Sequence, residues 1–236
     1  MRVFVIISYN GVKFFGSQVQ KEIPNTVFGE VEKVLNHLGI DSKPQPSGRT
    51  DRGVHATGQV FHIDLPPFWK DTKKLKKVLN EMLPKSIHVK KILHVENTLH
   101  ARYSAKKRVY RYLIKTSKPN PFEDDFITFL HNVNLQQIQQ NIKLFEGEHN
   151  FEYFMKTGSE TTSKTRTVYK AFAYKYKNTI VLNFEANGFL RTQVRFMVGA
   201  VLNLTKQQIK EKLSLQKNHK LKPAPSNGLY LAKVKY

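Results

Sequence analysis

Cysteine is absent from this 236-residue chain, and acidic side chains are few in it. The lack of cysteine excludes disulfides, thiolate metal ligands and a cysteine nucleophile, and it fits a reducing compartment. Near the start of the chain, only the five residues Val3–Ile7 are consecutively apolar. That run is too short for the apolar core of a signal peptide or for a membrane span. We therefore expect a soluble cytoplasmic protein without a membrane partner.

Sequence patterns of metal, nucleotide and serine chemistry are missing as well. The nine histidines are scattered, and none stands in an HExxH motif or in a paired spacing with aspartate. No P-loop, GxGxxG or GxSxG pattern occurs, so nucleotide hydrolysis, dinucleotide binding and serine hydrolysis lose their usual support. We therefore expect no metal ion and no cofactor.

Positive charge is what the chain has in excess. Lys and Arg number 39 against 18 Asp and Glu, which gives a formal net charge of +21. Such an imbalance favours a polyanionic partner, with nucleic acid first and an anionic membrane surface second. The chain also has 16 Phe and 10 Tyr interleaved with its lysines. This mixture suits RNA, because aromatic rings stack on unpaired bases.

Hydrophobic periodicity predicts strands and helices that alternate along the chain. Amphipathic patterns indicate helices at 27–38, 75–83, 135–145 and 189–204. Apolar or alternating stretches indicate strands at 3–7, 61–65, 87–95, 109–114, 167–176, 179–186 and 229–234. The elements form two similar series, so we predict an α+β chain with two domains, residues 1–100 and 101–236.

Five lysines crowd the predicted helix near residue 75, namely Lys70, Lys73, Lys74, Lys76 and Lys77. Two interpretations remain open for this cluster. A surface helix normally presents a solvated charged face. Contacts to nucleic-acid phosphates are the other interpretation, and they would make binding strongly dependent on salt.

The stretch GRTDRGVHATGQV, residues 48–60, places a single carboxylate among cations and glycines. Asp51 follows Arg49 by two residues and directly precedes Arg52. An aspartate in a glycine-rich loop is most often a turn residue, because its side chain bonds nearby backbone groups. A nucleophile is the second interpretation, since nearby cations favour the ionised carboxylate and glycine lets the backbone approach a ligand closely.

Residues 48–60 resemble the signature loop of the TruA family of tRNA pseudouridine synthases, whose pattern is close to GRTDAGVHA-x-GQV. Further matches follow in family order along nearly the whole chain. They are FFGSQVQ (14–20), LHARYSAKKRVYRYLI (99–114), NPF (120–122), FEGEHNF (145–151), TRT (165–167), FEANGFLRTQVRFMVGAVL (184–202) and GLYL (228–231). So many matches in order make the resemblance highly specific.

The resemblance implies that uridine is isomerised to pseudouridine in the anticodon stem-loop of tRNA, at positions 38, 39 and 40. In this reaction the C1′–N1 bond breaks, the base turns, and C5 bonds to C1′. The reaction involves no net oxidation or reduction and no net gain or loss of water, so no cofactor is needed. The developing charge on the sugar favours a neighbouring carboxylate, as in glycosidases. A stacked base must also be flipped out of the stem.

The family motifs imply roles for individual residues. Asp51 corresponds to the nucleophile. Arg49 and Arg195 correspond to positions that hold the carboxylate and contact RNA. Tyr110 corresponds to the tyrosine that stacks on the flipped uracil and assists removal of the C5 proton. Further candidates for contacts with RNA or for lining the pocket are Gln18, Arg52, His55, Arg166, Leu229 and Leu231. Core packing explains the two leucines equally well.

Three positions depart from the family pattern. Ser17 stands where the family usually has tryptophan, which removes an aromatic surface from the FFGSQVQ segment. Arg52 replaces the usual alanine and is a candidate phosphate contact. Arg191-Thr192-Gln193 replaces a commoner His-His-Met run. None of the three departures changes the expected nucleophile, Tyr110 or Arg195.

For the fold, the resemblance implies two similar α+β halves, each an antiparallel or mixed sheet with helices on one face, RRM-like or ferredoxin-like. It also implies an active-site cleft between the halves and a homodimer with tRNA lying across both subunits. The alternative is a non-catalytic RNA-binding protein with two RRM-like domains. That alternative explains the charge and the aromatic residues but gives Asp51 no role, and the RRM stacking motif is absent from the sequence.

Overall fold

The computed structural model describes residues 1–20, 25–158 and 163–236, and the chain forms two compact units. The first unit comprises Met1–Lys106 together with Leu231–Tyr236, and the second comprises Lys107–Tyr230. The chain thus enters the second unit a few residues after the boundary expected at residue 100, and its C-terminal residues return to the first unit. Periodicity identifies a terminal strand, but it does not reveal which distant strand becomes its neighbour.

The first unit is built on a sheet with the strand order β4–β1–β3–β10. Its strands are β1 (Arg2–Tyr9), β3 (His55–Asp64), β4 (Ile87–His94) and the part of β10 (Leu229–Lys235) that belongs to this unit. The short β2 (Gln45–Pro46) pairs with β3. β1 runs antiparallel to both β3 and β4. Both of its edges are therefore paired, and most of its apolar side chains are buried.

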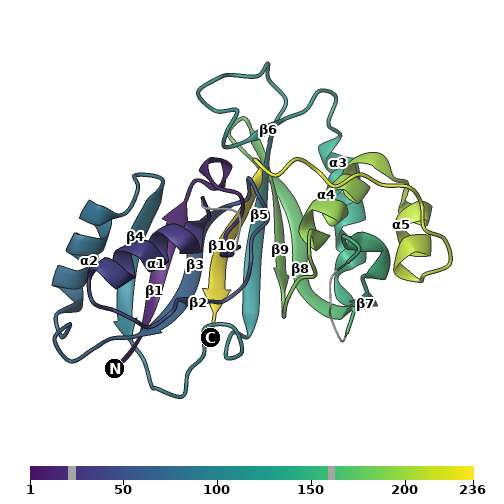
Figure 1. Ribbon diagram of the computed structural model, residues 1–236. Coiled ribbons are helices and arrows are strands. Elements are labelled where there is room, and N and C mark those ends of the chain that lie inside the picture. The colour runs from purple at the N-terminus through teal and green to yellow at the C-terminus, as the bar shows by residue number, and fades with distance from the viewer. Residues whose placement is uncertain (21–24, 159–162) are drawn as a thin grey trace. The chain divides into compact units, whose positions relative to one another are not determined.

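Two helices cover one side of this sheet (Figure 1), namely α1 (Val27–His37) and α2 (Thr72–Met82). Phe28 of α1 packs edge-on against Phe61 of β3, with 5.5 Å between the ring centroids. Asn80 of α2 donates to the carbonyl of Val89 and accepts from its N–H. The side chain of Asn80 therefore satisfies backbone groups of the edge strand β4. A short 3₁₀ helix, Gly11–Lys13, follows β1.

The second unit contains a sheet with the strand order β5–β9–β8–β7, and a short strand β6 runs parallel to β5. These strands are β5 (Lys107–Lys115), β6 (Thr128–Phe129), β7 (Gly147–Asn150), β8 (Thr165–Tyr176) and β9 (Thr179–Ala186). β8 and β9 form the predicted hairpin, in which Lys177 takes a positive φ of 50°.

The helices of the second unit lie together beside its sheet (Figure 1), namely α3 (Leu135–Ile142), α4 (Gln193–Asn203) and α5 (Lys206–Leu213). Short 3₁₀ helices cover Lys143–Phe145 and Glu152–Phe154. Gln139 of α3 donates to the carbonyl of Ala173 on β8 at 3.0 Å. Within the described ranges, none of the helices is long and apolar enough to cross a bilayer.

The predicted α+β class is confirmed, while several element boundaries differ from the prediction. The helix expected from residue 189 begins at Gln193, because Thr192 takes a left-handed φ of 64° immediately before it. β3 begins at His55, inside the stretch that resembles the signature loop. Periodicity does not predict α5, although Thr205 and Gln208 form a capping box at its start.

Candidate active site

The candidate residues fall into two groups, one in each unit. The first unit carries Gln18, Arg49, Asp51, Arg52, His55 and Leu231, and the second carries Tyr110, Arg166, Arg195 and Leu229. Most of the first group lies on or beside the loop that joins β2 to β3. This loop contains Asp51 and rests on a network of buried polar side chains.

The loop turns sharply between Asp51 and the start of β3. Gly53 has a φ of 78°, a conformation that favours glycine, and the N–H of Val54 donates to the Asp51 carbonyl at 3.1 Å. Asp51 is half-buried, whereas Arg49 and Arg52 are exposed. The turn therefore combines one accessible carboxylate with two accessible guanidinium groups within four residues of chain.

Arg52 is held by an aromatic ring from the neighbouring segment. The carbon at the centre of its guanidinium lies 4.3 Å from the centroid of the Phe15 ring. Attraction between a cation and an aromatic face stabilises such a pair. Arg52 directly follows Asp51 in the chain, and this contact connects the loop to the segment of residues 14–18.

Ser17 forms the closest connection between that segment and the loop. Its Oγ accepts the N–H of Thr50 at 2.8 Å, and its own N–H donates to the Thr50 carbonyl at 3.1 Å. Gly16 makes this approach possible, since a Cβ there would lie 3.2 Å from the Thr50 carbonyl oxygen and its φ is 98°. The residue before Asp51 is thus bound through both of its backbone polar groups.

Tyr9 holds the side chain of the same threonine. Its hydroxyl lies 2.7 Å from Oγ1 of Thr50, and both groups are buried. Burial raises the pKa of Tyr9 to about 12, although its hydrogen bond with Thr50 acts in the opposite direction. The Tyr9 hydroxyl therefore stays neutral at physiological pH and can act as a hydrogen-bond donor.

Gln59 holds the other end of the loop. Its side-chain nitrogen donates to the Gly48 carbonyl at 2.9 Å. Its side-chain oxygen accepts from the hydroxyl of Ser47 at 2.7 Å and from the N–H of Val60 at 3.2 Å. This buried amide fixes the backbone where the loop leaves β2.

His55 has a supporting position at the start of β3. It is buried, and its Nδ1 accepts the N–H of Gly11 at 3.1 Å. The backbones meet closely here, because a Cβ on Gly11 would lie only 1.9 Å from the Val54 carbonyl oxygen. His55 therefore anchors the 3₁₀ turn after β1 against the loop.

In the second unit, Tyr110 and Tyr112 of β5 differ in their surroundings. Tyr110 is half-buried and packs edge-on against Phe189, with 5.2 Å between the ring centroids. Tyr112 is fully buried; its hydroxyl donates to the Pro225 carbonyl at 3.0 Å and lies 2.7 Å from Oγ1 of Thr128. Burial raises the pKa of Tyr112 to about 12. Tyr112 is thus a core residue, while the ring of Tyr110 remains partly accessible.

Both arginines of the second unit bond to backbone carbonyls. The Nε of Arg195 on α4 donates to the Ala224 carbonyl at 2.7 Å. Arg166 at the start of β8 donates from one Nη to the carbonyls of Ser163 and Thr165. Burial lowers the pKa of Arg166. These bonds orient both guanidinium groups without neutralising their charge.

The remaining candidates lie at the two extremes of exposure. Leu229 and Leu231 are buried, and Gln18 is exposed. The burial of the two leucines fits core packing as well as a pocket wall. Sequence reasoning did not select Tyr9, Thr50 or Gln59, all of which support the Asp51 loop. Gln59 does carry a signal, because a polar residue amid the apolar positions of a strand is typical of a specific buried hydrogen bond.

Across residues 1–20, 25–158 and 163–236, no group of three or more His, Asp or Glu side chains is arranged to hold a metal ion. Among the candidate residues, Asp51 and the partly accessible Tyr110 carry groups that can take part in proton transfer or bond formation. A carboxylate such as that of Asp51 can stabilise a cationic or polarised reaction centre beside it.

Comparison with known proteins identifies close relatives. A family model described as tRNA pseudouridine synthase matches residues 142–236. The tRNA pseudouridine synthase A of Wolinella succinogenes is 37% identical, and the match covers 99% of this chain and 94% of that protein. The enzymes of the same name from Campylobacter jejuni (strain RM1221) and Helicobacter hepaticus are 33% and 35% identical, over 100% and 98% of this chain and 100% and 97% of theirs.

Proposed function

Because this chain belongs to the tRNA pseudouridine synthase A family, we propose that it isomerises uridine to pseudouridine in tRNA, at positions 38, 39 and 40 of the anticodon stem-loop. The full-length similarity to enzymes of that name supports the reaction. The observation that carries the assignment within this chain is the Asp51 loop, with its accessible carboxylate on a rigid, neutral support. The non-catalytic RNA-binding alternative has no support from these relatives.

Asp51 is the nucleophile of the proposed mechanism. Its carboxylate attacks C1′ of the target nucleotide as the C1′–N1 bond breaks, and the electrons of that bond leave with the uracil. The base then turns, and C5 bonds to C1′ while the carboxylate departs. C5 loses one proton and N1 gains one, so the product has the composition of the substrate. One carboxylate is sufficient, because no water has to be activated.

Arginines surround this chemistry in the proposal. By correspondence with the family motifs, Arg49 and Arg195 are assigned to bind the Asp51 carboxylate and the RNA backbone. Planar guanidinium groups suit both tasks, because they bind carboxylate and phosphate oxygens in pairs. Arg52, whose guanidinium is fixed on Phe15, contributes a further phosphate contact.

Tyr110 is the proposed partner of the flipped uracil. Its half-buried ring is held by Phe189, which leaves part of its surface for a ligand. The hydroxyl assists removal of the C5 proton after the base has turned. Leu229 and Leu231 supply apolar surface beside the substrate, and Gln18 and Arg166 complete the proposed set of RNA contacts. His55 is buried, so it supports the Asp51 loop and does not contact RNA.

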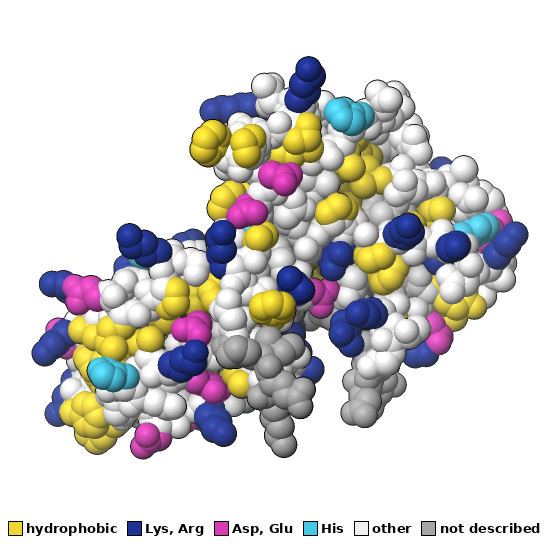
Figure 2. Space-filling view, turned by 45° about the horizontal axis from the view of Figure 1, so that its top comes forward, with side chains coloured by type: hydrophobic (Ala, Val, Ile, Leu, Met, Phe, Trp, Pro, Cys, Tyr) yellow, Lys and Arg dark blue, Asp and Glu magenta, His cyan; other side chains and the backbone are white. Residues whose placement is uncertain are grey.

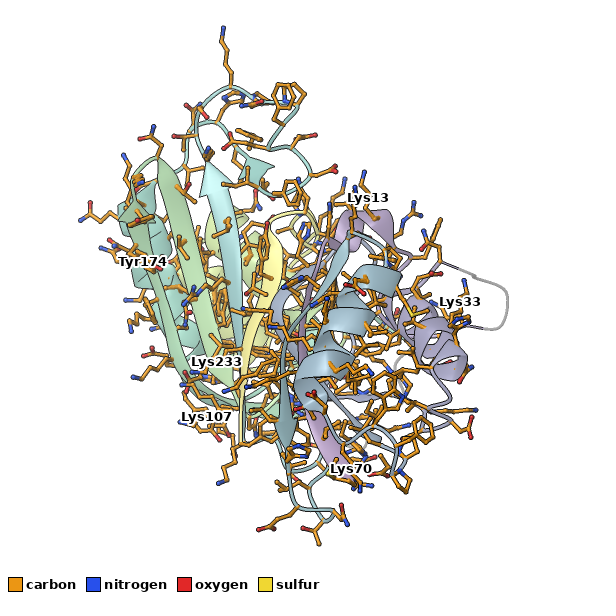
Figure 3. The ribbon with its side chains drawn as sticks, turned by 90° about the vertical axis from the view of Figure 1, so that its left-hand side faces the viewer. Lys13, Lys33, Lys70, Lys107, Tyr174 and Lys233 are labelled. Atoms are coloured by element: carbon orange, nitrogen blue, oxygen red, sulfur yellow. The ribbon has the colours of Figure 1, made fainter. Side chains whose placement is uncertain are left out.

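The basic surface provides the attraction for tRNA. Lysine and arginine side chains are distributed over the face of the protein visible in Figure 2, with fewer acidic ones among them. On the first unit, the exposed residues Lys13, Lys33 and Lys70 are labelled in Figure 3. Phosphate contacts of this kind release counterions and supply binding energy that can offset the cost of flipping a base.

The direct test of this function is a map of pseudouridine in tRNA. Unmodified tRNA transcripts are incubated with the purified protein and read at single-nucleotide resolution. We expect pseudouridine at positions 38, 39 and 40 and at no other uridine. Binding of tRNA without any conversion would favour an RNA-binding protein instead. Conversion outside the anticodon stem-loop would retain the reaction and overturn the proposed target.

We further propose that the protein is a cytoplasmic homodimer. Three exposed rings, Phe172, Tyr174 and Tyr176, alternate along β8 and therefore share the sheet face opposite to the buried Ala171 and Ala173. Tyr174 is labelled in Figure 3, and its ring stacks with that of Phe172 at 6.0 Å. Exposed aromatic clusters mark interaction sites, and a two-fold dimer joins the same patch from two copies.

Light scattering of the purified protein tests the dimer. Tyr174→Glu places a charge in the proposed contact, and we expect it to give a monomer in place of a dimer. Tyr103→Glu is the matched control, because Tyr103 is also exposed but lies in the first unit. A monomeric wild-type protein, or a dimer that survives Tyr174→Glu, would exclude this face as the contact.

A further inference from the structure

The contacts beneath the Asp51 loop point to a role for a residue that departs from the family pattern. Resting on the proposed function, we infer that Ser17 is a positioning residue, which fixes the backbone on the N-terminal side of Asp51 and thereby the direction of its carboxylate. Ser17 does not touch the substrate in this scheme. It acts through Thr50, the residue that immediately precedes the nucleophile.

Two close hydrogen bonds between Ser17 and Thr50 define this role, and Oγ of Ser17 makes a third, longer one to the Thr50 carbonyl at 3.5 Å. The Thr50 N–H belongs to the peptide group that follows Arg49, and Oγ of Ser17 accepts it at 2.8 Å. The Thr50 carbonyl belongs to the peptide group that precedes Asp51, and the N–H of Ser17 donates to it at 3.1 Å. Because both peptide planes are held by the same residue, rotation about the Thr50 backbone is restricted from both sides.

Burial makes this arrangement hard to replace. Ser17 is 1% exposed and Thr50 is 7% exposed, so water has little access to the bonded groups. Removal of the Ser17 hydroxyl would leave the Thr50 N–H without its acceptor in a buried position, which is unfavourable. The loop would then shift to bring this N–H to another acceptor, and Asp51 would move with it.

The chemistry of the side chain also explains why serine suits this position. Tryptophan, the usual residue of the family pattern, offers only an N–H donor and cannot accept the Thr50 N–H. In this chain the hydroxyl supplies that acceptor. On the opposite side of the threonine, Tyr9 holds the side-chain oxygen at 2.7 Å, so Thr50 is fixed between two buried hydroxyl groups.

This role predicts an effect on the chemical step and little effect on binding. A displacement of about 1 Å in a reacting group can cost roughly a hundredfold in rate. Affinity for tRNA depends mainly on phosphate contacts, which Ser17 does not make. We expect Ser17→Ala to lower the single-turnover rate constant at saturating tRNA at least about tenfold, because the nucleophile is no longer held in line. The dissociation constant for tRNA should stay within about threefold.

The experiment compares Ser17→Ala and Ser17→Thr with Ser42→Ala as the matched control. Ser42 lies in the same unit, and its Oγ likewise accepts a backbone N–H, that of Asp64 at 2.8 Å. All proteins are assayed well below the lowest of their unfolding temperatures. Ser17→Thr retains the hydroxyl and should keep most of the rate, and Ser42→Ala should keep all of it. If Ser17→Ala does not fold, Ser17→Cys replaces it, since the thiol is a weak acceptor of similar size.

Several results would overturn the inference. One is a wild-type single-turnover rate in Ser17→Ala. Another is an equal loss of rate in Ser17→Ala and in a folded Ser17→Thr. A third is a loss of tRNA affinity that accounts for the whole fall in activity. Failure of the proposed function is distinguishable, because the wild-type protein would then form no pseudouridine. Amide hydrogen exchange at Thr50 provides a readout that needs no activity, and it should accelerate in Ser17→Ala but not in Ser42→Ala.

Discussion

At the scale of single residues, the Asp51 loop separates the proposed nucleophile from the groups that support it. Asp51 is half-buried, while its neighbour Thr50 is buried and bonded to the neutral side chains of Tyr9 and Ser17. The pKa of Tyr9, raised by burial to about 12, keeps one of those partners neutral at physiological pH. A neutral support fixes the backbone without adding a second charge that would compete for the arginines.

Asp51→Asn tests the nucleophile itself. The substitution keeps the shape of the side chain and removes its charge, so we expect turnover to disappear while tRNA binding changes by no more than about a few-fold, since phosphate contacts dominate affinity. Single-turnover formation of pseudouridine is the measurement, with mass spectrometry to exclude deamidation back to aspartate. Conversion by a clean preparation of this variant would refute the role of Asp51.

Tyr110 distinguishes stacking from proton transfer. Tyr110→Phe keeps the ring and loses the hydroxyl, and we expect its single-turnover rate to fall by about 10²–10⁴-fold, as for loss of a general acid–base group. Tyr110→Leu also loses the ring and should cost a further 1–3 kcal/mol or so in binding, typical of base–aromatic stacking. A Tyr110→Phe enzyme of normal rate would limit this residue to a stacking surface.

Tyr112→Phe is the control for that series, and the structure defines its expected effect. The buried Tyr112 hydroxyl bonds to the Pro225 carbonyl, so its removal should lower the free energy of unfolding by about 1–3 kcal/mol. Its catalytic rate should remain normal below the unfolding transition. If Tyr112→Phe were slower than Tyr110→Phe, the family tyrosine would have been assigned to the wrong position.

At the scale of elements, His62 connects β3 to the turn that contains His100 and Ala101. The Nδ1 of His62 accepts the N–H of Ala101 at 3.2 Å, and its ring packs edge-on against His100, with centroids 4.5 Å apart. Burial, followed by the nearby His100, lowers the pKa of His62 to about 4. Only the neutral ring can accept the Ala101 N–H through Nδ1, so this connection depends on protonation.

This linkage predicts that acid weakens the first unit. The folded-state pKa of His62 lies below the ordinary histidine value of 6.5, so the unfolded chain takes up a proton first as the pH falls. The contribution of His62 to stability is complete above pH 6.5 and is lost progressively down to about pH 4. Urea unfolding across that window should show a smaller loss in His62→Asn than in the wild type. His94→Gln, at an exposed position of β4, should leave the loss unchanged; equal pH dependence in all three proteins would contradict the assignment.

At the scale of the whole molecule, the net charge of +21 is the dominant property. Its lysines include a group on α2, where Lys73, Lys74 and Lys77 are exposed and Asp71 caps the start of the helix. Exposure leaves both earlier interpretations of this cluster open, because a solvated face and a phosphate-binding face are equally accessible. With tRNA as the proposed partner, this charge should make the affinity for tRNA depend on the salt concentration.

Affinity for tRNA should fall steeply as the salt concentration rises. Each phosphate neutralised by the protein contributes about 0.7–0.9 to the slope of log affinity against log salt. Replacement of Lys73, Lys74 and Lys77 by alanine reduces the slope if these lysines contact phosphate and leaves it unchanged if they form a solvated face. Filter binding across a salt series measures both. A flat dependence for the wild-type protein would mean that the charge serves another purpose.

The sequence by itself determined the class of the fold and predicted a candidate site for the chemistry. Local patterns predicted most strands and helices, because the periodicity of a strand or an amphipathic helix is present in any short window of sequence. The GRTDRGVHATGQV stretch singled out Asp51 for the same reason, since its carboxylate, arginines and glycines are neighbours in the chain. The family resemblance added the reaction and is confirmed by the full-length relatives.

Only the tertiary structure decided which residues support the Asp51 loop. Ser17 and Tyr9 are far from Asp51 in sequence, and nothing in their local patterns indicates that they bind the loop. The polar position of Gln59 within a strand predicts a buried hydrogen bond, but it was the structure that identified the partners as Ser47 and Gly48. The return of the C-terminal residues to the first unit and the difference between Tyr110 and Tyr112 were decided in the same way. Hydrogen bonds and burial depend on which distant segments meet, and that is set by packing of the whole chain rather than by any window of residues.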